Sequence, residues 1–188
     1  MQRRTTKAIV FTALFAALTA ACAFISIPVP GTPIPIVLQN MMAVLSGMLL
    51  GPFLGTTSTA VFILAGLLGL PVFSGGTGGF AKLMSPTGGF IIGYAISSLL
   101  AGLILGKPGL DGKKHIARTI LAALFGFAVM YVPGVLHFMH SLEKTFRETM
   151  ALCVIPYLPG DLIKMVLCIL ISIPLRRSAA LYIFGDES

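Results

Sequence analysis

Long runs of apolar residues, separated only by short connectors, constrain this chain more than any other feature. The runs occupy residues 8–27, 36–51, 53–70, 88–105, 116–136 and 150–175. A run of about 20 apolar residues is the length that an α-helix needs to cross the hydrocarbon core of a bilayer. The sequence therefore predicts an all-α membrane protein, a bundle of six transmembrane helices.

The composition agrees with a bilayer as the solvent for most of the chain. Of its 188 residues, 56% are hydrophobic and 10% are charged, whereas soluble domains carry about 25% charged residues. Six spans need about 120 residues, which leaves room only for connectors. We therefore expect a single integral membrane domain, residues 1–188, and any function must lie inside the bundle.

The basic residues indicate how the bundle lies in the membrane. The net charge is +7, but the chain lacks the continuous basic stripe of a nucleic-acid binder. With the N-terminus inside, the inner side collects Arg3, Arg4, Lys7, Lys107, Lys113, Lys114, Arg118, Arg176 and Arg177, and the outer side Lys82, Lys144 and Arg147. Because cytoplasmic loops carry excess Lys and Arg, we expect both termini to be cytoplasmic and the chain to be a multi-pass protein of the cell membrane.

The two outer connections are unusual in composition. The first, 28–35, is rich in proline, which predicts a stiff, extended segment. The second, 71–87, contains Gly-Gly-Thr-Gly-Gly at 75–79, and such glycine density allows a close backbone approach to a ligand with amides free to donate. These connections are typical of a pocket wall that faces outward, although Gly and Pro also occur in simple turns.

Asp161 and Lys164 are the sharpest local signal. Ionisable groups inside a span are costly and usually face a partner, a cavity or a substrate path. Their spacing of three places both on one face of a helix, and the preceding Pro159 and Gly160 predict that a helix starts or is interrupted there. The alternative is that Asp161 caps the segment and pairs with Lys164, so that each neutralises the other.

Small residues recur at a spacing of four. Ala13, Ala17 and Ala21 give the first span a smooth face that allows close helix contact, either within the bundle or with a separate membrane partner. Glycines repeat the spacing at Gly47, Gly51 and Gly55, at Gly89 and Gly93, and at Gly102 and Gly106. We interpret these glycines as packing contacts.

Metal and enzyme chemistry are weakly supported. His137 and His140 could share a metal ion, but Glu143 is the only further ligand at a suitable spacing, so interfacial polar roles are favoured. The three cysteines form no Cys-x-x-Cys pair. A phosphate-binding loop, a nucleophile elbow and a His-Glu-x-x-His helix are all missing from the sequence. We expect neither an enzyme nor a bound cofactor.

An ordered set of motifs resembles a known family. The motifs are PIPI at 33–36, LQ at 38–39, LLGP at 49–52, GLPVF at 69–73, GGTGG at 75–79, PTGGF at 86–90 and LPGD at 158–161, followed by Lys164. From about residue 8 to 177, the chain resembles the BioY family of biotin transporters, the substrate-binding components of energy-coupling-factor transporters. Phe90 stands where that family often has tyrosine.

The resemblance implies a six-helix bundle that captures biotin from outside and docks onto a transmembrane coupling protein bearing two ATPases. Biotin offers two ureido N–H donors, a carbonyl and a valerate carboxylate. Asp161 suits the donors, Thr77 or Gln39 suits the other polar groups, and Lys164 either balances Asp161 or reaches the carboxylate. The candidate substrate-binding residues are Asp161, Lys164, Thr77, Gln39, Lys82 and Phe90, and the candidate docking residues are Ala13, Ala17 and Ala21.

Two other functions fit the same pattern. A related substrate-binding subunit for a different vitamin or a metal ion would share the architecture. A membrane-embedded enzyme or scaffold is a different class, which a solute-binding assay would separate.

Overall fold

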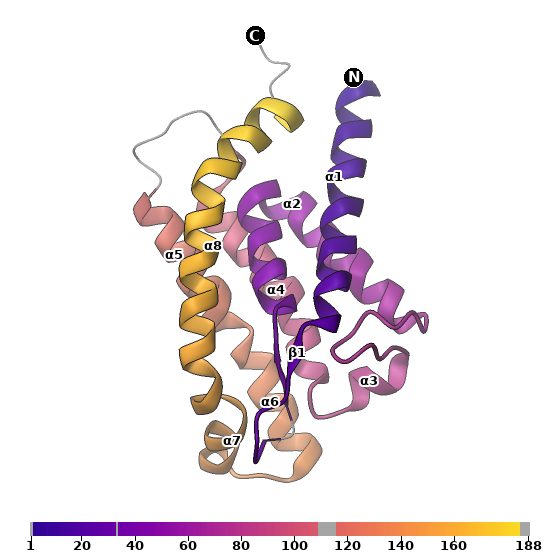
Figure 1. Ribbon diagram of the computed structural model, residues 1–188, viewed down its shortest axis with the longest axis vertical. Helices are drawn as coiled ribbons and strands as arrows, with labels where there is room; N and C mark the ends of the chain where they lie inside the picture. The colour runs from indigo at the N-terminus through magenta and orange to yellow at the C-terminus, as the bar shows by residue number, and fades with distance from the viewer. Residues whose placement is uncertain (1, 33, 109–115, 185–188) are drawn as a thin grey trace.

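The structure is a computed structural model that describes all residues except 1, 33, 109–115 and 185–188 (Figure 1). The described residues form helices joined by short connections and one two-stranded ribbon. The longer helices are α1 (Gln2–Ala21), α2 (Gln39–Leu67), α4 (Gly88–Leu105), α5 (Ile116–Val129), α6 (Tyr131–Leu142) and α8 (Leu158–Ala179). The shorter ones are η1 (Cys22–Phe24), α3 (Phe80–Met84), α7 (Phe146–Cys153), η2 (Ile155–Tyr157) and η3 (Ala180–Phe184).

Five helical stretches of the described chain are long and apolar enough to cross a membrane. They are Thr5–Phe24, Gln39–Leu67, Gly88–Leu105, Ile116–Leu142 and Phe146–Ile183. The second stretch combines two of the runs predicted from the sequence and is broken inside. The molecule is therefore an all-helical membrane protein with five to six apolar helices.

The break in α2 falls at Gly51, where the sequence places the Gly51-Pro52 motif. Gly51 has φ 81° and ψ 179°, a conformation that is costly for any residue with a side chain, and Pro52 cannot donate the helical hydrogen bond. The chain folds back here. The contacts across the break show this, since the Ser46 hydroxyl lies 3.3 Å from both the Gly55 carbonyl oxygen and the Thr59 hydroxyl. The two halves of α2 thus pack against each other.

Glycine allows the centre of the bundle to pack closely. A methyl group added to Gly47 would lie 2.0 Å from the Ser98 carbonyl oxygen of α4, and one added to Gly102 would lie 2.6 Å from Pro52. Gly89 and Gly93 are similarly close to α6 and to Met130 just before it. The interpretation as packing contacts is confirmed for Gly47, Gly55, Gly89, Gly93 and Gly102. It is wrong for Gly51, which serves the break, and for Gly106, which ends α4 with φ 72° and has no atom within 4 Å of an added methyl group.

The outer surface of the bundle is apolar. Leu162, Ile163 and Leu170 of α8 each expose more than half of their surface, and similar side chains cover the other long helices. A soluble protein rarely exposes a continuous apolar surface of this extent. Lipid therefore covers these faces, and the chain is a multi-pass membrane protein.

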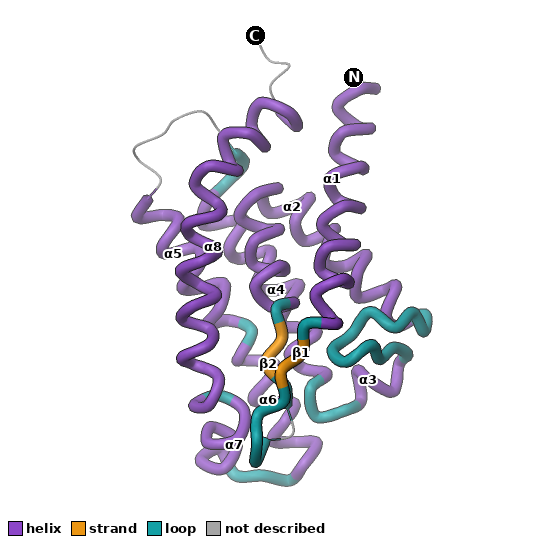
Figure 2. The backbone as a smooth tube through the Cα atoms, viewed as in Figure 1, coloured by secondary structure: helices purple, strands orange, loops and turns teal. Residues whose placement is uncertain are grey.

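The first outer connection is closed by a short ribbon (Figure 2). Strands β1 (Ser26–Ile27) and β2 (Ile36–Val37) pair antiparallel, with Ser26 opposite Val37 and Ile27 opposite Ile36. The described residues of the proline-rich segment, 28–32 and 34–35, lie in the connection between them. The loop is therefore anchored at both ends, next to the start of α2.

The second outer connection is a compact turn followed by α3. Four amides of the Gly-Gly-Thr-Gly-Gly segment are already engaged, contrary to our expectation from the glycine content. Gly75 N donates to Ala23 O at 3.2 Å, Gly79 N to Gly66 O at 2.7 Å, and Gly76 N and Thr77 N both donate to Phe73 O. The first two bonds tie the turn to η1 and to the end of α2, and the last two close the turn on itself.

The two ends of the bundle differ. The start of α1 and the end of α8 lie at one end, whereas the ribbon, α3 and α7 lie at the other (Figure 1). Arg176 of α8 closes the first end, where its guanidinium donates to the carbonyl oxygens of Met48, Leu105, Gly106 and Lys107. This buried side chain satisfies carbonyls that the break in α2 and the end of α4 leave without helical partners.

Candidate ligand-binding cavity

The two ionisable residues predicted from the sequence lie at the start of α8. The helix begins at Leu158, after the 3-10 turn η2, as Pro159 and Gly160 predicted. Asp161 is in the first turn of α8 and Lys164 one turn later. The Lys164 ammonium lies 2.5 Å from Asp161 Oδ1, and both side chains are buried.

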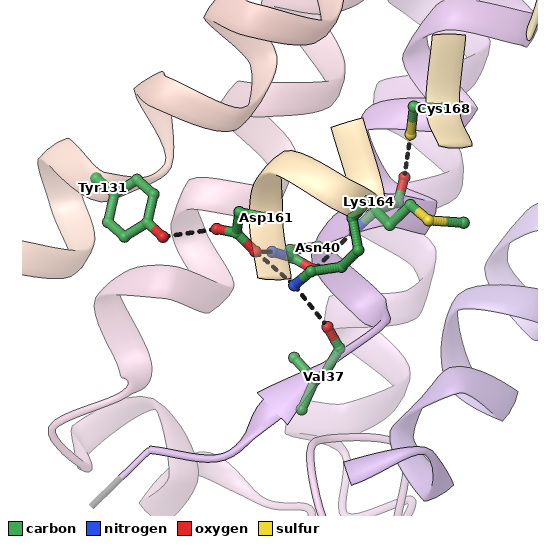
Figure 3. A network of polar contacts seen from close by, with 7 residues as sticks. Val37, Asn40, Tyr131, Asp161, Lys164 and Cys168 are labelled. Atoms are coloured by element: carbon green, nitrogen blue, oxygen red, sulfur yellow. Dashed lines mark hydrogen bonds and ion pairs between the residues drawn. The ribbon is translucent and has the colours of Figure 1, made fainter. Parts of the chain in front are cut away.

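Asn40 and Tyr131 join this pair in one polar network (Figure 3). Asn40 Nδ2 donates to Asp161 Oδ1 at 3.0 Å, and the Tyr131 hydroxyl donates to Asp161 Oδ2 at 2.6 Å. Lys164 Nζ donates to Asn40 Oδ1 at 3.0 Å and to the Val37 carbonyl oxygen at 3.1 Å. The network joins α2, α6 and α8, with the ribbon supplying Val37.

Counting donors and acceptors shows which member of the network is still available. An ammonium has three N–H donors, and those of Lys164 go to Asp161, Asn40 and Val37. A carboxylate accepts at about four lone-pair positions, and Asp161 receives bonds from Lys164, Asn40 and Tyr131. Asp161 therefore keeps room for one more donor, whereas Lys164 has none left to give.

This network borders a cavity of about 170 Å³ near the end of the bundle that carries the ribbon. Much of the wall is apolar, and α2, α4, α6 and α8 all contribute to it. The lining residues are Ser26, Ile34, Pro35, Ile36, Val37, Gln39, Asn40, Ser74, Gly75, Lys82, Thr87, Phe90, Ile91, Tyr94, Met130, Tyr131, Cys153, Tyr157, Asp161 and Lys164. A largely apolar cavity with a few convergent polar groups is typical of a small-molecule site.

The cavity brings together five of the six residues predicted to bind substrate, namely Gln39, Lys82, Phe90, Asp161 and Lys164. Thr77 does not line it, and its hydroxyl donates to the Ser74 carbonyl oxygen at 3.0 Å. The turn instead presents Ser74 and Gly75 to the cavity.

Gln39 lines the cavity but its amide nitrogen is already engaged. Nε2 donates to the carbonyl oxygens of Val72 at 2.7 Å and Thr19 at 3.3 Å. The side chain is 1% exposed. Gln39 thus ties the start of α2 to α1 and to the second outer connection.

Lys82 of α3 is the other cation at the cavity. Within the part of the chain that the structure describes, its ammonium has no hydrogen bond or ion pair. The side chain is half-buried, and this burial lowers the pKa of Lys82 below the ordinary value for lysine, because burial disfavours the charged form.

Phe90 fixes the position of Tyr131. The two rings meet edge to face, with centroids 5.9 Å apart and planes at 87°, an arrangement that aromatic pairs favour. Gly134 lies directly against the Phe90 ring, where an added methyl group would be 2.4 Å from it. Phe90 thus holds the Tyr131 ring from which the hydroxyl reaches Asp161.

Hydrogen bonds of Tyr157 fix the proline-rich connection beside the cavity. Tyr157, at the start of α8, donates its hydroxyl to the Ile34 carbonyl oxygen and lies 2.6 Å from the Thr32 hydroxyl. Ile34 and Tyr157 both line the cavity. These hydrogen bonds therefore keep the wall formed by residues 34–37 close to α8.

Several cavity residues were missed by the sequence analysis, chiefly Asn40, Ser74, Tyr94, Tyr131 and Tyr157. Asn40 lies directly after Gln39, so an unusual polar pair at the start of an apolar run was the available signal. The tyrosines gave no such signal, because aromatic residues are also common within apolar spans.

The alanines predicted to dock a partner lie on the outside of α1. Ala13, Ala17 and Ala21 are exposed, whereas Phe15 and Thr19 of the same helix are buried against the bundle. The three alanines are thus not used for packing within the chain.

The histidines form no metal centre in the described residues. Groups of three or more His, Cys, Asp and Glu side chains that could hold a metal ion are absent there. His137 Nε2 lies 3.0 Å from the Ser85 carbonyl oxygen, and the interfacial role of His137 and His140 stays a prediction.

The fold and the cavity together define a class of protein, a helical membrane protein that holds a small solute between its helices. A family model described as the BioY family matches residues 1–180. The chain belongs to the BioY family.

Similar proteins span nearly the same length. A protein of Pyrococcus horikoshii described as a probable biotin transporter BioY is 34% identical, over 88% of this chain and 94% of its own. The biotin transporter BioY of Lactococcus lactis is 31% identical, over 95% of each. A crystal structure of the S-component for biotin from an ECF-type ABC transporter matches with a TM-score of 0.83 and 28% identity, over 94% of each chain.

Proposed function

We propose that this chain captures biotin at the outer face of the cell membrane and delivers it as the substrate-binding subunit of an energy-coupling-factor transporter. The chain is a transporter component and not an enzyme. The observation that carries the proposal is the buried carboxylate of Asp161, which retains acceptor capacity at the wall of a cavity in a chain of the BioY family.

The ureido ring of biotin suits this end of the cavity. Its N–H groups donate, and Asp161 accepts through the position that Lys164, Asn40 and Tyr131 leave open. The three neighbours hold the carboxylate in place, and a hydrogen bond to a carboxylate is charge-assisted and about twice as strong as a neutral one. The apolar wall then packs against the carbon and sulfur atoms of the rings.

The proposed topology has six spans with both termini inside. It is supported by the sharp break at Gly51, which folds α2 back on itself so that its two halves pack against each other. A second support is that α1 begins and α8 ends at the same end of the bundle (Figure 1). Lys113 and Lys114, which contribute to the basic bias, lie outside the described residues.

The proposed partners are a transmembrane coupling protein and its two ATPase subunits. The chain itself has no phosphate-binding loop in its sequence, so the energy for release must come from elsewhere. The exposed stripe of Ala13, Ala17 and Ala21 on α1 supports a close helix contact with the coupling protein.

An uptake assay tests the proposed function. Cells that cannot make or import biotin receive this chain with and without a coupling module, and the entry of labelled biotin is followed with and without excess unlabelled vitamins. We expect uptake that needs this chain and that unlabelled biotin alone suppresses. Suppression by another vitamin instead would reassign the substrate.

A further inference from the structure

The short helix α3 has an apolar face that the described part of the chain leaves uncovered. Phe80 exposes 60% of its surface and Met84 58%. Four residues apart in a helix, the two side chains lie on one face. The other face is used by the protein, because Lys82 lines the cavity and Leu83 packs against the hydrophobic core. The outer face of α3 therefore needs a cover from outside the chain.

The segment around α3 lacks the charge of a connection that stands in water. From residue 8 to residue 106 the sequence contains a single charged residue, Lys82, and Lys82 belongs to the cavity wall. The connection between α6 and α7 instead exposes Glu143 and Lys144, and the exposed Arg147 follows in α7. The contrast indicates that the connection from α6 to α7 stands in water, whereas α3 lies closer to hydrocarbon.

The position of α3 agrees with this difference. In Figure 1, α3 lies at the side of the bundle, whereas α7 and the connection before it extend further towards the same end. Gly79, directly before α3, donates its N–H to the Gly66 carbonyl oxygen of α2 at 2.7 Å. Leu64 and Leu68 are exposed on either side of Gly66. The apolar face of α3 thus continues the surface that lipid covers on α2.

The protein fixes which face of α3 points outward. A methyl group added to Gly78 would meet the Leu70 carbonyl oxygen, and one added to Gly88 would meet that of Leu83. At the end of the helix, the Ser85 hydroxyl donates to the Lys82 carbonyl oxygen at 2.6 Å. Both ends of α3 are therefore held by close backbone contacts, and the helix cannot rotate to bury its apolar face.

We propose that α3 is an interfacial segment of the membrane, with Phe80 and Met84 between the acyl chains of the phospholipids at the end of the bundle that carries the ribbon. In the proposed topology this is the outer leaflet. The inference goes beyond the proposed function, since it does not depend on which solute the cavity holds. The lipid then covers the outer side of the helix whose inner side forms part of the cavity wall.

Size and continuity favour lipid over a protein as the cover. Two large side chains on a helix of five residues offer far less than the surface of about 800 Å² that each partner buries in a stable protein interface. The neighbouring face of α2 is already covered by lipid. An amphipathic helix at a membrane surface buries its apolar face about 5–10 Å into the boundary between headgroups and acyl chains, which fits a helix at the side of the bundle.

Fluorescence quenching in vesicles tests the proposal. The chain contains no tryptophan, so Phe80→Trp and Met84→Trp each introduce a single fluorophore into the full-length protein. In phosphatidylcholine vesicles, bromine near the headgroup end of the acyl chain should remove most of the fluorescence of both variants. Bromine at the far end should remove less, because an interfacial helix lies only about 5–10 Å deep. Acrylamide in the water should have little effect.

Two further single-tryptophan variants calibrate the measurement. Lys144→Trp replaces an exposed residue of the connection from α6 to α7, and acrylamide but not brominated lipid should quench it. Leu170→Trp lies on the exposed apolar face of α8, and bromine at the far end of the chain should quench it most.

The other outcomes overturn the proposal. If acrylamide quenches both α3 variants and brominated lipid does not, α3 stands in water. If neither quencher reaches them, a protein partner or a second copy of the chain covers this face. Because biotin takes no part in the readout, a chain that fails to bind biotin would refute the proposed function and still report the position of α3.

Discussion

Asp161 lies inside the bundle, where its neighbours compensate the cost of burying a carboxylate. A buried carboxylate without partners would cost several kcal/mol, but Lys164 lies 2.5 Å away and Asn40 and Tyr131 donate to the two oxygens. The sequence presented a site and a neutralising pair as alternatives. In the structure the pair is formed and also lines the cavity, so the two interpretations are compatible.

The stability of the protein should depend on the pair as a unit. Lys164→Met should lower the free energy of unfolding by about 3–5 kcal/mol, because it leaves the Asp161 charge buried without its cation. Adding Asp161→Asn to Lys164→Met removes that charge and should recover part of the loss. Thermal unfolding in detergent measures both variants. A double variant no more stable than Lys164→Met would show that the charge is already stabilised by Asn40 and Tyr131 alone.

Sequence could predict Asp161 and Lys164 but not their neighbours. An ionisable residue in a span is conspicuous because of its cost. Asn40 follows Gln39, and consecutive helical residues point about 100° apart, so only the packing decides which one faces the cavity. In the structure both line it, but Gln39 Nε2 is tied to Val72 and Thr19, and Asn40 joins Asp161 and Lys164.

At the scale of elements, the apolar runs predicted the helices well and their ends less well. The Gly51-Pro52 break was predicted correctly, because both residues oppose a continuous helix. The run predicted at 116–136 is two helices, α5 and α6, with Met130 between them. It continues to Leu142, since polar His137 and His140 are accommodated near the end of the bundle. Side-chain polarity alone could not place that boundary.

Close contact between α2 and α4 should make Gly47 intolerant of any side chain. Gly47→Ala would place a methyl group 2.0 Å from the Ser98 carbonyl oxygen, so the helices must separate, and we expect a loss of about 1–3 kcal/mol in unfolding free energy. Gly160→Ala is the matched control, because the nearest atom, of Ile36, is 3.9 Å away. Equal melting temperatures for the two variants would contradict this packing.

The outer face of α1 should matter for coupling and not for binding. Replacing Ala13 and Ala17 together by leucine fills the smooth stripe, and we expect biotin uptake with the coupling module to fail while biotin binding by the isolated chain persists. Leu14→Phe adds bulk at another exposed position of α1 and serves as the control. Loss of binding in the alanine variant would mean that the stripe supports the bundle instead.

At the scale of the whole molecule, the polar chemistry is divided between the ends of the bundle. The ribbon and α3 lie towards one end, and the start of α1 and the end of α8 lie at the other (Figure 1). The cavity belongs to the first end, because residues of the ribbon and of α3 line it. The topology that we propose from the basic bias of the sequence places the first end outside. The cavity is then placed to receive a solute from outside the cell.

Cysteine labelling tests this orientation. Thr77 and Arg118 are both exposed, so Thr77→Cys and Arg118→Cys should react with maleimides once the cell is opened. In intact cells, an impermeant maleimide should label only Thr77→Cys, with the parent protein giving the background from its native cysteines. Labelling of both positions in intact cells would overturn the six-span topology.

Binding of biotin to the purified chain, compared among the parent protein, Asp161→Asn and Lys164→Ala, tests the central claim most directly. We expect the parent to bind biotin with a Kd below about 1 µM. Asp161→Asn should weaken binding more than Lys164→Ala does, because its new N–H₂ group faces a ureido donor without an acceptor. If Asp161→Asn binds biotin as tightly as the parent protein, Asp161 is a structural residue and does not hold the ureido ring.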